Sequence, residues 1–367
     1  MFDTKILCFK YFRPVKVKKR ILVAPLDWGI GHATRCIPLI NALISQNYEV
    51  IIAADGRPMH LLSAEFPKIE MIRFEGYNIK YPKFLPMSIS MLLQAPKLLW
   101  KIKKENTALA EIIKDYNIDG VISDNRFGLY SNQVPCVFIT HQLQIQSPYF
   151  TKSMRKFNYK YINKYTACWV MDDEKLNLAG NLSKPNTLPN NTSYIGMQSR
   201  FEKQETDKKY DFLAIVSGPE PQRTILEKGL INALKDRKEK SLIVLGKPEA
   251  NSSEQIGSLT IKSHLNAKDL NTAILQSELI ICRPGYSTIM DLAKLEKKAI
   301  FIPTPGQTEQ EYLADNFMEK GICYAQKQSE FDFEIALKES SNYKGFNTTL
   351  PEYIILKDLF QIFNEKT

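Results

Sequence analysis

Paired cysteines are absent from this sequence of 367 residues. Its six cysteines are scattered and form no Cys-x-x-Cys motif, which argues against a disulfide framework and against a zinc site of that spacing. Long apolar runs are missing too. The longest uncharged apolar-rich stretch, residues 84–96, is shorter than the roughly 20 residues of a membrane-spanning helix. We therefore expect buried, reduced thiols in a cytoplasmic protein that is either soluble or peripheral on the inner face of the cytoplasmic membrane.

A secretory signal is also missing. The first residues lack the order of charged start, apolar stretch and small-residue cleavage site, and residues 1–19 are predicted to be a basic extension. Lys and Arg outnumber Asp and Glu by 49 to 40, a net charge of +9, which favours anionic partners. We do not expect nucleic acid among them, because no basic helix carries interleaved aromatics and no zinc spacing is present.

Apolar runs alternate with helical periodicity along most of the chain, which is 44% hydrophobic and 24% charged. Residues 20–195 and 211–350 each show this alternation, and the polar segment 196–210 is predicted to link them. Residues 351–367 are predicted to form a helix that packs back on the first domain. The pattern predicts two Rossmann-like α/β domains with doubly wound parallel sheets. Ligands of such a pair lie where the carboxyl ends of the strands face each other.

The segment CRPGYSTIMDL (282–292) has the pattern of a phosphate cradle. A strand ends, Gly285 turns the chain, and Ser287 and Thr288 open a helix whose free N–H groups suit a phosphate. Asp291 lies one turn further, where its carboxylate suits ribose hydroxyls. The alternative is purely structural: Thr288-x-x-Asp291 resembles a capping box. The residues alone leave both interpretations open.

Polar side chains also cluster after the next strand, in FIPTPGQTEQEYLADNF (301–317). Gln307, Glu309, Gln310 and Glu311 lie between a Pro/Gly turn and a helix. Amides and carboxylates at the carboxyl end of a strand suit the hydroxyls of a sugar. A solvated helix start is the alternative.

The first strand runs into LDWGIGHATR (26–35), which places Gly29, Gly31 and His32 on a strand-to-helix turn. The ordinary pKa of an imidazole, about 6.5, suits His32 to accept a proton from a substrate. His141 and Asp124 each end a later strand. His141 is expected to orient an acceptor or to be the base itself, and Asp124 to assist. Ordinary loop hydrogen bonding is the alternative for both.

Together these stretches resemble the GT-B glycosyltransferases. The similarity is to the family of the peptidoglycan lipid-linked N-acetylglucosaminyltransferase and the plant monogalactosyldiacylglycerol synthases, including its uncharacterised bacterial members, and spans about residues 20–325. GIGHATRCIPLINAL resembles the amino-terminal Gly-Gly-His turn of that family, and FITHQLQIQ its acceptor-side histidine segment. The resemblance implies the GT-B fold, with the acceptor bound by the first domain and the nucleotide-sugar by the second.

The resemblance also implies roles for individual residues. His32 would be the base, and Gly29 and Gly31 would let the acceptor approach. Leu265 and Asn266 would hold the uracil of the donor, and Gly285, Ser287 and Thr288 its diphosphate. Asp291 would hold the ribose. Gln307 and Gln310 would contact the donor sugar. Asp291 departs from the family, which has the longer Glu. The family's glycine-rich turn is also changed at 217–223, where only Gly218 is retained and Arg223 would supply charge.

The implied reaction is transfer of a sugar, with inversion, from a UDP-sugar to a lipid-linked or cell-envelope hydroxyl. No cofactor or metal is expected, because there is no Asp-x-Asp motif; the adjacent Asp172 and Asp173 are expected to cap the next helix. Two alternatives remain open: a nucleotide-sugar 2-epimerase on the same fold, and a non-catalytic partner that binds nucleotide-sugar or lipid. A dinucleotide enzyme is disfavoured because GIGHAT ends in Thr where that fingerprint has Gly or Ala.

Residues 81–104 are apolar and end in the basic cluster Lys97, Lys101, Lys103 and Lys104. One interpretation is a patch that docks on an anionic membrane. The other is two core-packed helices with a solvated basic face. Pro96 is expected to open the second of these helices.

Overall fold

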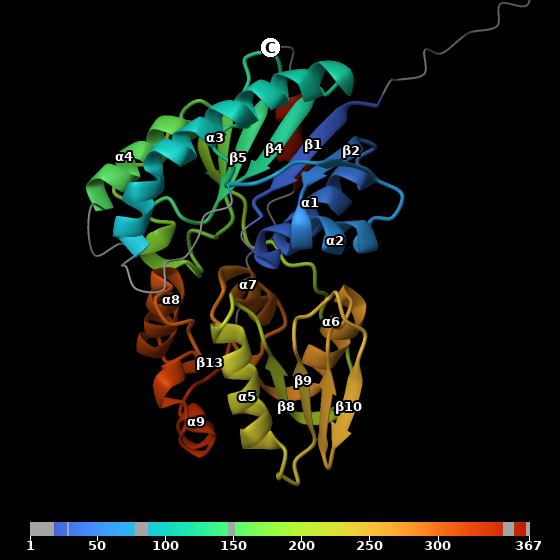
Figure 1. Cartoon of the computed structure of the whole chain (residues 1–367), viewed down its shortest axis with the longest axis vertical. Coiled ribbons are helices and arrows are strands. Elements are labelled where there is room, and N and C mark those ends of the chain that lie inside the picture. Colours follow the sequence, from blue (N-terminus) through green and yellow to red (C-terminus); the bar gives the residue numbers. More distant parts are fainter. Residues whose placement is uncertain (1–17, 28, 78–86, 146–150, 348–355, 365–367) are drawn as a thin grey trace, which may run out of the picture.

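The computed structural model describes residues 18–27, 29–77, 87–145, 151–347 and 356–364. Two α/β domains are stacked along the long axis of the molecule (Figure 1). Most of the predicted basic extension, residues 78–86 and parts of the predicted carboxyl-terminal helix lie outside the described residues. The five described cysteines are buried and unpaired, as predicted: Cys36, Cys136, Cys168, Cys282 and Cys323.

The first domain is built on a parallel sheet in the order β3-β2-β1-β4-β5-β6-β7. Its strands are β1 (Arg20–Pro25), β2 (Glu49–Ala54), β3 (Glu70–Arg73), β4 (Gly120–Asp124), β5 (Cys136–Thr140), β6 (Ala167–Val170) and β7 (Thr192–Tyr194). The central strands are continuous apolar runs because helices cover both of their faces. β7 is an addition to the prediction: its three residues lie in a polar segment that carries no strand periodicity.

The second domain repeats this design in the order β10-β11-β9-β8-β12-β13-β14. Its strands are β8 (Tyr210–Ile215), β9 (Ser241–Val244), β10 (Ser253–Ile256), β11 (Leu259–Lys262), β12 (Ser277–Cys282), β13 (Lys298–Phe301) and β14 (Tyr324–Ala325). All pairs are parallel except the edge hairpin β10–β11. The two sheets confirm the predicted pair of doubly wound domains.

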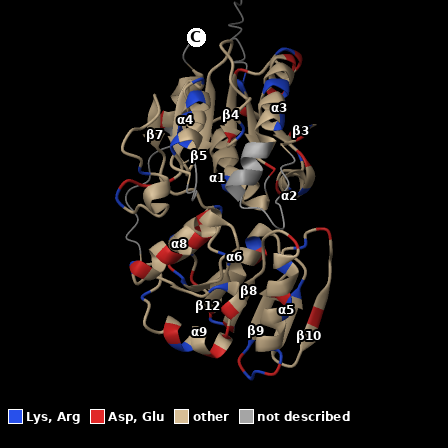
Figure 2. Ribbon diagram, turned by 60° about the vertical axis from the view of Figure 1, so that its left-hand side comes forward, with Lys and Arg blue, Asp and Glu red and all other residues tan. Residues whose placement is uncertain are grey.

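Helices cover the faces of both sheets. They are α1 (Ile30–Ser45), α2 (Gly56–Glu65), α3 (Met87–Asp115) and α4 (Thr151–Ile162) in the first domain, and α5 (Gln222–Leu234), α6 (Ala267–Leu275), α7 (Tyr286–Lys294), α8 (Thr308–Glu319) and α9 (Phe333–Ser340) in the second. Lys and Arg residues occur along α3 and α4 (Figure 2).

The prediction that Pro96 opens a new helix is wrong. α3 runs unbroken from Met87 to Asp115 with Pro96 inside it. Proline removes one helical hydrogen bond, and Pro96 is exposed, so water can satisfy the carbonyl that loses its partner.

The end of the chain packs against the first domain. α10 (Leu356–Leu359) leads into a turn, Phe360–Phe363, whose two phenylalanines are fully buried. The Phe363 ring lies 6.2 Å from the ring of Trp169 in β6. Gly120 makes room for it, because a Cβ there would lie 2.4 Å from Phe363 Cδ1. The last turn of the chain therefore completes the core of the first domain.

Phe363→Ala should lower the free energy of unfolding of the first domain by about 3–5 kcal/mol, the usual cost of emptying a buried phenylalanine site. Chemical denaturation followed by circular dichroism measures it. Ile335→Ala, at a side chain 51% exposed on α9, is the control and should change stability by less than about 0.5 kcal/mol. Equal effects of the two variants would contradict the packing described.

Candidate active site between the two sheets

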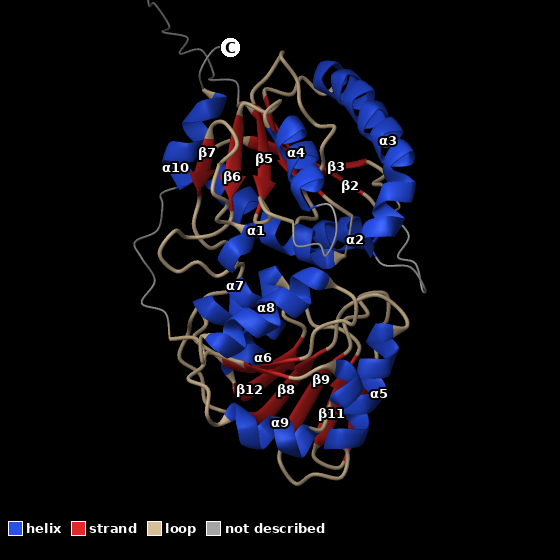
Figure 3. Cartoon of the chain, turned by 90° about the vertical axis from the view of Figure 1, so that its left-hand side faces the viewer, coloured by secondary structure: helices blue, strands red, loops and turns tan. Residues whose placement is uncertain are grey.

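The candidate site lies where the carboxyl ends of the two sheets meet. Strand order reverses between β1 and β4 in the first sheet and between β8 and β12 in the second, and such reversals are where open α/β sheets bind ligands. α1 follows β1, α7 follows β12, and these two helices pack against each other. Figure 3 shows α7 and α8 between the two sheets.

Two glycines shape the turn before α1. Gly29 is the N-cap residue with φ +84°, a conformation that favours glycine. Gly31 faces the other domain. Its carbonyl accepts a hydrogen bond from Ser287 Oγ at 2.9 Å, and a Cβ at Gly31 would lie 3.3 Å from Ser287 Oγ. Gly31 therefore allows α7 to approach α1 closely.

His32 and Asp124 lie together at the first reversal point. His32 Nδ1 is 3.1 Å from Asp124 Oδ2, and the His32 side chain is 15% exposed while Asp124 is fully buried. Within the described residues His32 Nε2 has no hydrogen-bond partner. A histidine oriented by a carboxylate through one nitrogen, with the other nitrogen open, has the geometry of a general base.

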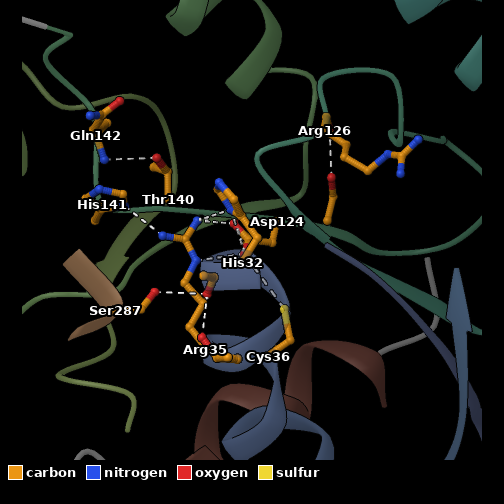
Figure 4. A network of polar contacts seen from close by, with 12 residues as sticks. His32, Arg35, Cys36, Asp124, Arg126, Thr140, His141, Gln142 and Ser287 are labelled. Atoms are coloured by element: carbon orange, nitrogen blue, oxygen red, sulfur yellow. Dashed lines mark hydrogen bonds and ion pairs between the residues drawn. The ribbon is translucent and has the colours of Figure 1, made fainter. Parts of the chain in front are cut away.

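Arg35 completes this centre, and the sequence analysis missed it. Its Nε donates to Asp124 Oδ2 at 2.7 Å and a second guanidinium nitrogen binds Asp124 Oδ1 (Figure 4). Burial alone would raise the pKa of Asp124, but the charges of Arg35 and His32 hold it well below its usual range. The signal for Arg35 is its spacing, because residues three apart on a helix share one face.

His141 joins the two domains. Its Nδ1 lies 2.7 Å from an Arg35 nitrogen, and its Nε2 lies 2.9 Å from Glu309 Oε1 at the start of α8. Its ring stacks on Tyr286 with centroids 4.3 Å apart, and burial lowers its pKa. Both ring nitrogens of His141 are therefore engaged, whereas His32 keeps one open.

The amino end of α7 is free of side-chain caps. Its N-cap is Gly285, so Thr288 lies inside the helix, and the alternative that Thr288 and Asp291 form a capping box is wrong. Among the described residues no side chain bonds the first-turn amides. Asp291 instead accepts a hydrogen bond from Ser199 Oγ at 2.6 Å. Burial raises the pKa of Asp291 to about 6, an effect that the nearby charge of Arg200 partly offsets.

Arg200 is a second residue that the sequence analysis missed. It belongs to the connection between the domains, and its charge acts on Asp291 and on Glu65 of α2. Its Nε is buried with no hydrogen-bond partner among the described residues. A cation with an unsatisfied donor beside Asp291 suits an anionic ligand at this end of α7.

The remaining predicted donor residues follow β8, β11 and β13 at the carboxyl edge of the second sheet. Gln310 Oε1 accepts from the amide of Thr304 at 2.8 Å, and Gln307 immediately precedes α8. Leu265 follows β11, and the side chain of Asn266 caps α6.

The segment after β8 holds the last two predicted donor residues, Gly218 and Arg223. Gly218 has φ +107°, and a Cβ there would lie 3.3 Å from Thr304 Oγ1. Arg223 is paired with Glu220 through two bonds of 2.9 and 2.6 Å, so its charge is already partly neutralised.

Asp172 and Asp173 organise the loop after β6. Asp172 accepts from the amides of Leu178 and Ala179 at 3.0 and 3.1 Å, and Asp173 accepts from the amide of Leu176. The sequence predicts that the two carboxylates cap the next helix. They do cap the turn that follows, but that turn leads into a single 3₁₀ turn, Gly180–Leu182, and not into an α-helix.

Two family models each match part of the chain. Residues 223–341 match the glycosyltransferase family 28 C-terminal domain, and residues 19–165 match glycosyl transferase family 1. The second domain, with Gly285 and Glu309, thus corresponds to the family 28 C-terminal domain. The first domain, with His32 and Asp124, lies within the other match.

Two curated relatives carry the name UDP-N-acetylglucosamine–N-acetylmuramyl-(pentapeptide) pyrophosphoryl-undecaprenol N-acetylglucosamine transferase. The protein from Trichlorobacter lovleyi is 28% identical over 99 residues, 26% of this chain and 23% of its own length. The protein from Alkaliphilus oremlandii is 22% identical over 337 residues, 86% of this chain and 87% of its own length. The solved structure of the spinosyn rhamnosyltransferase SpnG is similar in fold, with TM-score 0.61, 15% identity and coverage of 89% and 93% of the two chains.

No helix in the described part of the chain is both long enough and apolar enough to cross a membrane. The two facing parallel-sheet α/β domains have the GT-B architecture.

Asp291 makes stability depend on pH. Its pKa is about 6 in the folded chain against an ordinary 3.8, so ionising it opposes folding, and its contribution is lost as the pH rises from about 4 through 6. Asp291→Asn keeps an acceptor for Ser199 and removes the charge. At pH 7.5 we expect it to raise the free energy of unfolding by about 1–2 kcal/mol, because partial exposure reduces the full desolvation cost of ~3 kcal/mol.

Urea denaturation of both proteins between pH 4 and pH 8 measures this difference. The two curves should approach each other near pH 4, where the wild-type carboxyl is protonated in the folded state and only about half ionised in the unfolded state. A stabilisation of the same size at pH 4 and pH 7.5 would show that the charge of Asp291 is not its cause.

Proposed function

We propose that this chain, a glycosyltransferase of the GT-B fold with a family 28 C-terminal domain, transfers a sugar from a UDP-sugar to a hydroxyl of a lipid-linked or cell-envelope acceptor. One observation carries the proposal. His32, oriented by Asp124 at 3.1 Å, lies at the carboxyl edge of the first sheet. The uncapped end of α7 meets it from the second, where Ser287 bonds Gly31 at 2.9 Å.

The donor site is assigned to the second domain. The free amides at the start of α7 suit the diphosphate. Asp291 lies further along the same helix, and the charge of Arg200 acts on it. We assign to Asp291 the ribose attached to that diphosphate. The choice of uracil is supported by the names of the two curated relatives.

The acceptor hydroxyl attacks the anomeric carbon from the side opposite the diphosphate. His32 Nε2 accepts the hydroxyl proton as the new C–O bond forms, and the bond from the anomeric carbon to the phosphate oxygen breaks. UDP leaves with the electron pair of that bond, and the sugar is transferred with inversion. Asp124 stabilises the imidazolium that results.

We further propose that this step needs no metal ion. The leaving diphosphate gains negative charge, and a glycosyltransferase must neutralise it. Helix α7 presents its positive end there, and Arg200 supplies a full positive charge without a hydrogen-bonded carboxylate partner of its own among the described residues. Fixed donors of this kind are an effective way to stabilise developing charge.

Loss of the proposed base should remove catalysis but not donor binding. We expect His32→Ala to lower kcat/KM for transfer about 10²–10⁴-fold, because the acceptor hydroxyl then lacks its proton acceptor. UDP affinity, measured by calorimetry, should change less than about threefold. The assay follows labelled sugar from UDP-sugars into a bacterial lipid extract. His60→Gln, at an exposed position on α2, is the matched control and should keep full activity.

Each alternative function predicts a different result. Full cellular function of His32→Ala would favour a non-catalytic binding partner. Conversion of the UDP-sugar to its 2-epimer with no acceptor present would favour an epimerase. Release of UDP that depends on added lipid acceptor would exclude both.

A lipid acceptor is supported by a basic, partly apolar surface on the first domain. On α3, Leu99 and Trp100 are 46% and 61% exposed, and Lys104 Nζ lies 5.7 Å from the Trp100 ring. α3 and α4 pack together through Leu98, Ile102, Phe157 and Tyr161. Further lysines and arginines follow both helices (Figure 2). We propose that this surface docks on anionic membrane.

Charge reversal on α3 should weaken membrane binding. Each lysine near an anionic surface contributes about 1 kcal/mol, so Lys97→Glu/Lys104→Glu should lower binding to phosphatidylglycerol vesicles at least 10-fold in sedimentation. The matched control is Lys228→Glu/Lys235→Glu, at the same spacing on α5 beside the exposed Ile225. An equal loss in the control would indicate that net charge alone, and not α3, drives binding.

A further inference from the structure

A single buried guanidinium contacts both histidines of the site. Arg35 is 3% exposed and lies 2.9 Å from His32 Nδ1, 2.7 Å from His141 Nδ1 and 2.7 Å from Asp124 Oδ2. We propose that Arg35 is a positioning residue that fixes which nitrogen of His141 carries the proton and holds the carboxylate that orients His32. This inference rests on the proposed function only in its kinetic consequence.

The protonation of His141 follows from the chemistry of arginine. A guanidinium has five N–H donors and no acceptor, so His141 Nδ1 must accept a hydrogen bond from Arg35. The proton of the neutral ring is then on Nε2, which donates to Glu309 Oε1 at 2.9 Å. Arg35 thus makes His141 a donor toward the second domain and excludes it as the base.

The protonation of His32 depends on Asp124. Arg35 holds this carboxylate through both oxygens, which keeps it ionised and fixes its direction. Oδ2 retains a lone pair that faces His32 Nδ1 at 3.1 Å. An Arg35 nitrogen lies 2.9 Å from the same ring atom, and Nδ1 cannot donate to Asp124 and accept from Arg35 at once. The base form of His32, with its proton on Nδ1 and the Nε2 lone pair left for the acceptor hydroxyl, therefore needs that Arg35 nitrogen to donate to Asp124 Oδ1 and not to the ring. In this form the two histidines carry their protons on opposite nitrogens.

The same contacts connect the base to the donor domain. Glu309 accepts from His141 and, at 2.6 Å, from Gln142, both in the first domain. The chain Asp124–Arg35–His141–Glu309 is complete only when the two domains are together. Arg35 thereby links the orientation of the base to the position of the second domain, without touching substrate.

Nitrogen-15 NMR of the histidine rings tests the inference without any substrate. The chain has only four histidines, so His→Gln variants assign every ring. At pH 8 the wild type should show His141 protonated on Nε2 and His32 on Nδ1. In Arg35→Gln, His141 should change to a mixture of tautomers. A proton on Nδ1 of His141 in the wild type, or no change at either ring in Arg35→Gln, would overturn the inference.

Kinetics separate positioning from a purely structural role. His32 faces charged or titratable groups from α1, β4, the end of β5 and α8: Arg35, Cys36, Asp124, His141 and Glu309. Loss of the Arg35 charge leaves Asp124 unbalanced, so in Arg35→Gln the acid limb of kcat/KM should move about one unit to higher pH. The rate should fall 10- to 100-fold with KM for the donor unchanged.

Two further variants keep the test informative if Arg35→Gln folds poorly. Arg35→Lys restores the positive charge but not the planar guanidinium that bonds several partners at once. It should return the acid limb of the kcat/KM profile toward its wild-type position while the rate stays low. Arg35→Gln/Asp124→Asn removes both charges and should likewise return the acid limb toward its wild-type position while the rate stays low. A uniform loss of rate in all three variants with no movement of the limb would overturn the positioning role.

The control removes a more exposed ion pair away from the site. Arg20 binds Glu49 at 3.0 Å at the amino end of β1, and Arg20→Gln should leave both the rings and the pH profile unchanged. The expected ring protonation without any detectable transfer would support Arg35 and count against the proposed function. Transfer activity, with histidine protonation unchanged in Arg35→Gln, would support the proposed function and count against the positioning role of Arg35.

Discussion

Parallel strands place all their carboxyl ends on one edge of a sheet, and here two such edges face each other. Most residues of the candidate site follow from this constraint. Gly31 and His32 follow β1, Asp124 ends β4, and Ser287 follows β12 in the other domain. No strand needs a special conformation to deliver a functional group. Loops that are remote in sequence meet because the strand order of each sheet reverses at the same edge.

The meeting of these edges buries charge, and the chemistry of the site depends on how that charge is compensated. Arg35 and Asp124 are both buried and paired through two bonds. Removing one partner of such a pair usually costs about 3–5 kcal/mol, although the pair itself adds little net stability over apolar residues. A charged pair at this position is therefore better explained by what it does to His32 and His141. Asp291 is compensated less completely, and its raised pKa is the result.

Much of this arrangement could be predicted from the sequence, because apolar strands and glycine turns are local signals. They indicated both sheets, the turn at Gly285 and the position of His32. The roles of Arg35, Arg200 and Glu309 could not be predicted in the same way, since each depends on a side chain from a distant segment. Pro96 misled for a related reason: its local preference is to begin a helix, and only the exposed position in α3 shows why the helix continues. The short strands β7 and β10 pair at sheet edges, where polar residues are tolerated and periodicity is weak.

The packing of Phe360 and Phe363 into the first domain has a consequence for how the chain is made. Domains generally fold in the order in which the ribosome releases them. Here the first domain lacks two core aromatics, next to Tyr48 and Trp169, until residue 363 has been synthesised. The second domain has all of its strands by then. The half that is translated first is thus the half that matures last, because two of its core residues are released only after the whole second domain.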